Sequence, residues 1–202
     1  MKSRDLGFRL LFNVTFVKKY LITVPAKNFF VLRELSGAIS EGLAKKGYQI
    51  DQSKIAVAGH SIGGYSALAI AGAQFDSNIF QKFSDLLQKI FDFFQVQSFT
   101  FPSIKAIVSM EGACGDSVYG TFSGSFVKVD HPVLFMYGTG GRPANRCDAT
   151  RTYLQNSIAF QKGIYQEIAY PDAAHIDFSR TNSTYNKKMK EDLGAFLDKF
   201  VK

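Results

Sequence analysis

The sequence has 202 residues, of which 46% are apolar and 20% are charged, and its formal net charge is +7. These proportions are typical of a globular protein, and a chain of this length can bury a sizeable core, so we expect a single domain over residues 1–202. No apolar run approaches the about 20 residues that span a bilayer, which excludes stable membrane insertion. The lysines form no run longer than a pair, which indicates a solvated basic surface rather than a nucleic-acid site.

The first half of the chain alternates between helical and extended patterns. Apolar residues at steps of three and four predict an amphipathic helix over 28–46, which Gly47 ends. A short apolar run predicts a strand over 55–58, and an alanine-rich stretch predicts a buried helix over 63–73. The predicted order is therefore strand, tight turn, helix.

The second half repeats this alternation. Its apolar patterns predict strands over 104–110, 133–137 and 164–170, and helices over 148–160 and 185–201. Strands that alternate with helices indicate an α/β fold, with a mostly parallel sheet and helices on both of its faces.

Residues 75–101 interrupt the alternation. Their phenylalanine and leucine side chains recur at helical spacing, which predicts a helical insertion. Apolar residues at this spacing are more often plain core than the lining of a ligand pocket, so the insertion gives no substrate preference.

The segment Gly59-His60-Ser61-Ile62-Gly63 lies in the turn between the first strand and its helix. A serine hydroxyl is a weak nucleophile, and it needs a strained turn that projects it towards a base and towards N–H donors for an oxyanion. Glycines on both sides let the strand and the helix approach closely. The segment therefore predicts Ser61 as a catalytic nucleophile and the Ile62 amide as one oxyanion-hole donor.

The chain has three histidines that could serve as the base. His60 belongs to the turn itself, and His131 stands at the start of a predicted strand, which is the edge of a parallel sheet away from active sites. His175 comes just after the last predicted strand, where the loops of the other edge converge. We therefore expect His175 to be the general base.

The acid of a catalytic triad is less tightly specified. In many enzymes whose nucleophilic serine stands in such a strand-to-helix turn, the acid follows the penultimate strand in a Gly-x-x-Asp pattern. Here the segment 138–141 reads Gly-Thr-Gly-Gly. Glu111 directly follows the preceding strand and could orient the imidazole of His175. Asp116 and Asp148 stay open as alternatives.

Cys114 and Cys147 each follow one of two sequential predicted strands, and sequential strands are usually neighbours in a sheet. We therefore expect them to form a disulfide, which would brace both candidate acid loops. A bridge would imply an oxidising compartment such as a periplasm or the exterior, whereas free thiols would fit the cytoplasm. Two cysteines at this spacing do not suit a zinc site, so no metal is predicted.

Several segments together resemble one group of proteins, the dienelactone-hydrolase-like and platelet-activating-factor-acetylhydrolase-like branch of the α/β hydrolases. The resemblance covers the chain from about residue 25 to its end, and it is carried by the segments 58–65, 104–108, 132–135 and 174–178. It implies the α/β-hydrolase fold, with Ser61 as nucleophile, His175 as base and Glu111 as acid. Members of this group carry aspartate where this chain has Glu111.

One departure from the group concerns the N-terminal part. Early strands of the superfamily carry a His-Gly loop that supplies a second oxyanion donor, and neither His-Gly nor Gly-Gly-Gly precedes Ser61 here. Only about fifty residues stand before the nucleophile strand. We therefore expect the chain to hold the C-terminal part of the fold, without the first strands.

Two functions follow from these patterns. The first is an ester hydrolase that acts on a small-molecule ester through an acyl-enzyme on Ser61 and uses no cofactor. The second is a catalytically silent remnant or partner-binding module, in which the turn around Ser61 persists only as structure.

Overall fold

The computed structural model describes residues 45–47, 51, 53–75, 104–114, 120–140 and 147–201. Lys45–Gly47 form a turn in which Gly47 has a φ of +80°. The rest of the helix predicted over 28–46 lies outside these residues, as does the insertion predicted over 75–101 apart from Phe75.

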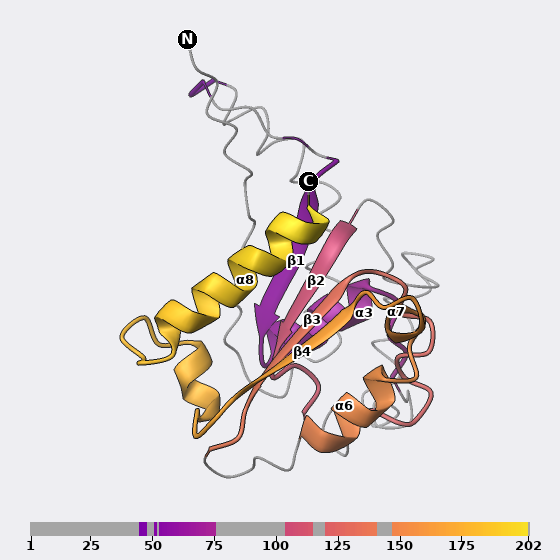
Figure 1. Cartoon of the computed structure of the whole chain (residues 1–202). Coiled ribbons are helices and arrows are strands. Elements are labelled where there is room, and N and C mark those ends of the chain that lie inside the picture. Colours follow the sequence, from indigo (N-terminus) through magenta and orange to yellow (C-terminus); the bar gives the residue numbers. More distant parts are fainter. Residues whose placement is uncertain are drawn as a thin grey trace, which may run out of the picture.

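The described residues form a parallel sheet of four strands in the order β1-β2-β3-β4 (Figure 1). The strands are β1 (Ile55–His60), β2 (Ile104–Met110), β3 (Val133–Gly138) and β4 (Tyr165–Tyr170). The predicted order and the parallel direction are confirmed. The predicted start of β1 at Ile55 is confirmed, but its predicted end at residue 58 was wrong, because pairing with β2 continues through Gly59 and His60.

Helix α3 (Ile62–Ile70) follows β1 after the single residue Ser61, and α8 (Asn186–Phe200) ends the described chain. The single helix predicted over 148–160 was wrong, because the structure has α6 (Asp148–Leu154) and α7 (Ile158–Gln161) instead. Ser157 separates them: its backbone is extended, with φ −75° and ψ 157°, and its side chain accepts a hydrogen bond from the Phe160 N–H. A serine in this conformation begins a new helix rather than continuing the old one.

Two apolar cores lie on opposite faces of the sheet. Alternate side chains of a strand point to opposite faces, so Ile107 and Val133 pack with Tyr65 and Leu68 of α3, while Val108 and Leu134 pack with α8. The α8 side chains in this second core include Met189, Phe196 and Leu197. Both faces are therefore covered by helices, as predicted.

Within the described part of the chain, no helix has the length and apolar character needed to cross a membrane.

The carboxyl ends of β3 and β4 lie against each other. The Gly140 N–H donates a hydrogen bond to the carbonyl of Ala173 at 3.0 Å. A Cβ on Gly138 would lie 2.1 Å from the same oxygen, so this position admits no side chain. Glycine at 138 thus lets the two loops approach.

This contact gives a stability prediction. Gly138→Ala should lower the free energy of unfolding by about 3 kcal/mol or more, because the added methyl group meets rigid backbone. Gly163→Ala is the matched control: Gly163 has open space around it but a φ of +68°, so only the backbone penalty of roughly 1 kcal/mol applies. Denaturant unfolding of both variants checks the ranking, and equal losses would contradict the steric argument.

Candidate active site

Ser61 occupies the strained turn that the sequence predicts between β1 and α3. Its φ of 57° and ψ of −119° are rarely adopted by a residue with a side chain. The Ser61 N–H donates to the Met110 carbonyl at 2.8 Å, which ties the turn to the end of β2. A Cβ on Gly59 would lie 2.3 Å from the backbone of Gly63, so glycine is needed where strand and helix meet. The predicted order of strand, turn and helix is confirmed, but the predicted end of the helix at residue 73 was wrong, because Gly72, with a φ of 102°, ends α3 after Ile70.

Ile62 is the first residue of α3. The N–H groups of the first turn have no acceptor within their own helix, and the positive end of the helix dipole lies there. The Ile62 amide is therefore suited to receive a negative oxygen.

The Glu111 side chain is buried just after β2, and the residue has a φ of 50°. Its Oε1 accepts a hydrogen bond from the Gly138 N–H at 2.8 Å. Its Oε2 pairs with Nδ1 of His175. The two oxygens thus join the end of β2 to the end of β3 and to the loop after β4.

His175 begins the short 3-10 helix η6 (His175–Phe178), and about half of its side chain is exposed. The loop that carries it is fixed on both sides. Asp177 accepts a hydrogen bond from the Ala174 N–H at 2.8 Å, and the Tyr185 hydroxyl donates to the Pro171 carbonyl at 2.7 Å. One ring nitrogen of His175 therefore faces Glu111 while the ring stays accessible to solvent.

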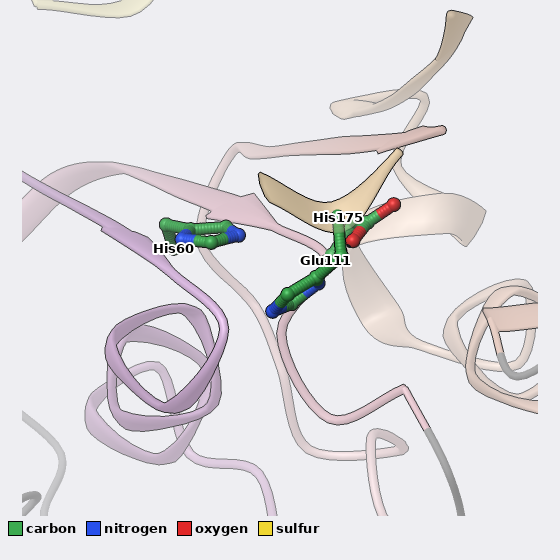
Figure 2. Close-up of side chains that lie close together, drawn as sticks. All are labelled: His60, Glu111 and His175. Carbon is green, nitrogen blue, oxygen red and sulfur yellow. Dashed lines mark hydrogen bonds and ion pairs between the residues drawn. The ribbon is translucent and has the colours of Figure 1, made fainter. Parts of the chain in front are cut away.

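His60 is a residue whose contribution to this site the sequence did not reveal. Its ring lies 4.4 Å from the ring of His175, centroid to centroid, and stacks on Phe178 at 6.0 Å. Figure 2 shows His60, Glu111 and His175 together at this edge of the sheet. The residue that precedes Ser61 in the chain is therefore in contact with His175. Its place beside the predicted nucleophile was the signal that could have indicated this.

Burial and, to a smaller extent, the neighbouring His175 lower the pKa of His60 to about 4. Its Nε2 is buried and has no hydrogen-bond partner, which favours an uncharged ring. Above about pH 4, His60 thus presents a neutral face to His175.

Backbone strain concentrates at one edge of the sheet. The described non-glycine residues with positive φ are Ser61, Glu111, Ala113 and Asp172, and each follows the carboxyl end of a strand. Such conformations cost of order 1–3 kcal/mol each and cluster at functional sites. This edge is where parallel α/β sheets bind ligands.

The other candidates lie elsewhere. Asp148 is exposed at the start of α6, where it pairs with Arg151 at 3.1 Å. Asp116 lies outside the described residues. His131 precedes β3 at the opposite edge, and burial lowers its pKa.

No hydrogen bond within the described part of the chain joins the Ser61 hydroxyl to His175.

His60, Glu111 and His175 each offer an atom of a type that binds metals, and these atoms lie within 4.8 Å of one another. Imidazole nitrogen and carboxylate oxygen are ordinary zinc ligands. However, Glu111 and His175 pair through Oε2 and Nδ1, so an ion between them would have to break that hydrogen bond. The arrangement fits a carboxylate that orients an imidazole.

Comparisons with known proteins identify the fold. No protein-family model and no curated protein matches the chain. Among solved structures, it is similar to esterase 2 of Thermogutta terrifontis, phosphoramylated by tabun, with 12% identity and a TM-score of 0.55 over 89% of this chain. It is also similar to a candidate dienelactone hydrolase from Klebsiella pneumoniae, with 18% identity and a TM-score of 0.51 over 84% of this chain. The matches span 63% and 61% of those two chains. These similarities confirm the predicted α/β-hydrolase fold.

The burial of His60 makes stability depend on pH. In the unfolded chain this histidine binds a proton below about pH 6.5, whereas in the folded chain it does so only below about 4. The free energy of unfolding should therefore fall as the pH drops from about 6.5 to 4, by up to about 3 kcal/mol from this group. His60→Phe keeps an aromatic ring and removes the titration.

The measurement is urea unfolding of the wild type and of His60→Phe at about pH 7 and about pH 4. The difference in free energy of unfolding between the two proteins should change by up to about 3 kcal/mol between these pH values. His131 is present in both proteins, so its own titration cancels. Parallel pH curves would show that His60 is not held neutral by burial.

Proposed function

We propose that this chain, which has the α/β-hydrolase fold, is a serine ester hydrolase that works through an acyl-enzyme on Ser61. The observation that carries the proposal is the buried carboxylate of Glu111 paired with Nδ1 of His175, at the sheet edge where Ser61 occupies a strained turn. A carboxylate, an imidazole and a serine hydroxyl are the groups that nucleophilic catalysis of acyl transfer requires.

In the first half of the reaction, His175 accepts the Ser61 hydroxyl proton at Nε2 while the serine oxygen attacks the ester carbonyl carbon. The carbonyl oxygen becomes an oxyanion and accepts a hydrogen bond from the Ile62 N–H. When the C–O bond to the alcohol breaks, His175 returns the proton to the leaving oxygen. In the second half, His175 accepts a proton from water while the water oxygen attacks the acyl carbon. The bond to Ser61 then breaks, His175 returns the proton to the serine oxygen, and the carboxylic acid product leaves.

Glu111 holds the imidazole in the form with its proton on Nδ1, which leaves Nε2 free to accept the serine proton. It also stabilises the imidazolium that forms during the reaction. The Gly138 N–H keeps the other carboxylate oxygen in place, so the acid does not rotate away from the ring. The bond between Ser61 and His175 has to form when substrate binds, as is common in enzymes whose unliganded sites are loosely aligned.

The substrate class we propose is a small-molecule ester, and no cofactor is needed for this chemistry. The esterase of similar fold is described as phosphoramylated by tabun, an organophosphorus agent. A fluorophosphonate probe is therefore a suitable test for a reactive serine here. The disulfide between Cys114 and Cys147, which the structure contains, favours an oxidising compartment such as a periplasm or the exterior.

A catalytically silent remnant or partner-binding module is the second candidate function. It is favoured by the lack of a hydrogen bond between the Ser61 hydroxyl and His175 among the described residues. Covalent labelling of Ser61 by the probe would exclude this candidate, and absence of labelling would support it.

The nucleophile and base are tested together. Ser61→Ala should abolish ester hydrolysis and probe labelling without loss of fold, because it removes the attacking oxygen and little volume. His175→Ala should lower turnover about as far, and the double variant should add little, because the two residues act as a unit. Turnover of a p-nitrophenyl ester measures this. Retained turnover in Ser61→Ala, or additive losses, would contradict the mechanism.

The acid is tested by isosteric changes at Glu111 and Asp148. Glu111→Gln should lower turnover by roughly 10³–10⁴-fold, because an amide favours the wrong tautomer of His175. Asp148→Asn should leave turnover within about a few-fold, since Asp148 is exposed and pairs with Arg151. The reverse ranking would move the acid to Asp148.

A further inference from the structure

The turn after β2 is strained on both sides of a glycine. Glu111 and Ala113 have φ values of 50° and 59°, each of which disfavours a residue with a Cβ by roughly 1–2 kcal/mol. Between them, Gly112 packs against the start of α3, where an added Cβ would lie 2.3 Å from the Gly64 carbonyl carbon. A turn of this kind persists only where its surroundings hold it.

Two links hold the far end of this turn to α6. The expected disulfide between Cys114 and Cys147 is present, with Cα atoms 4.3 Å apart. Next to it, the buried Thr150 hydroxyl donates to the Ala113 carbonyl at 2.7 Å. The covalent link comes three residues after Glu111.

Helix α6 is itself fixed to the sheet. Its Arg151 pairs with Glu167 of β4 at 2.8 Å and lies over the ring of Tyr137 in β3, 4.4 Å from the centroid. Because α6 is held by two strands, the disulfide ties the end of the strained turn to a rigid part of the molecule.

We propose that the Cys114–Cys147 disulfide is a positioning element that keeps the Glu111 carboxylate on His175. Its loss lets the turn relax towards ordinary backbone conformations, and the carboxylate leaves the imidazole. The consequence for turnover rests on the proposed esterase function, whereas the consequence for the Glu111–His175 hydrogen bond does not. A disulfide that only stabilised the fold would leave this bond unchanged in the folded protein.

The bond can be observed directly by proton NMR, because a histidine N–H that donates to a carboxylate gives a signal far downfield. The signal is assigned by its absence in Glu111→Gln and its persistence in Ser61→Ala. The full chain is then reduced with a phosphine, which breaks the S–S bond and supplies two electrons. Water supplies the two protons of the resulting thiols, and its oxygen is taken up by the phosphine, which becomes a phosphine oxide.

In the reduced protein we expect the downfield signal to be lost while the dispersed amide signals of the sheet remain. Alkylation of the two thiols by a dihalomethane forms two S–C bonds and releases two halide ions and two protons. The resulting methylene bridge, which the reductant cannot cleave, should restore the signal. An unchanged signal in the reduced, folded protein would overturn the proposal.

A second variant covers the case in which the reduced chain unfolds. Thr150→Val removes the neighbouring hydrogen bond to Ala113 and leaves the disulfide intact. The downfield signal should persist in this oxidised variant, because the bridge still holds the turn. Its loss there would show that the hydrogen bond, and not the disulfide, positions the acid.

Turnover provides an independent measurement. Reduction should lower kcat by about 10-fold or more with little change in KM, and it should have no further effect in Glu111→Gln, because the acid is already lost there. An equal fractional loss in both backgrounds would overturn the proposal. If the oxidised protein neither hydrolyses esters nor labels with the probe, the esterase function fails, and the NMR comparison still decides the role of the disulfide.

Discussion

The buried carboxylate of Glu111 is the interaction on which the arrangement of the candidate site depends. A buried charge without partners costs several kcal/mol, so both of its oxygens must be matched. One oxygen takes the Gly138 N–H and the other takes His175, which lies 64 residues further along the chain. The same requirement that stabilises the charge therefore draws together the ends of three neighbouring strands.

This edge of the sheet can hold strained backbone because the rest of the fold is tightly packed. Leu68, Ile107 and Phe135 in one core and Val108, Leu134 and Met136 in the other are fully buried. Burial of each such side chain contributes about 1.5–3 kcal/mol, which is comparable to the cost of one left-handed residue in a turn, and many such side chains are buried. The cores fix the strands, and the strands fix where Ser61 and Glu111 stand.

The features that the sequence predicts correctly are those that follow from local patterns and from rules of sheet topology. The strand over 104–110, the turn around Ser61 and the disulfide between Cys114 and Cys147 all belong to this class. The break at Ser157 within the predicted helix 148–160 was missed, because the residues on both sides of it continue the apolar spacing of a helix. The contact of His60 with His175 was missed for a different reason: it depends on loops whose non-glycine residues have positive φ, and spacing carries no sign of such conformations.

The position of the acid illustrates how a close contact between loops can select a residue elsewhere. At the end of β3 and just after it, Gly138 and Gly140 lie so near the backbone of Asp172 and Ala173 that an added Cβ on either would come within 2.1 Å of a carbonyl oxygen. The two loops therefore meet through bare backbone, and no carboxylate can project from these two positions. The end of β2 is the next strand end along the sheet, and its turn directs Glu111 into the space beside His175. An acid after β2 and a glycine at the end of β3 are thus parts of one packing arrangement, in which the Gly138 N–H donates to the carboxylate that follows β2.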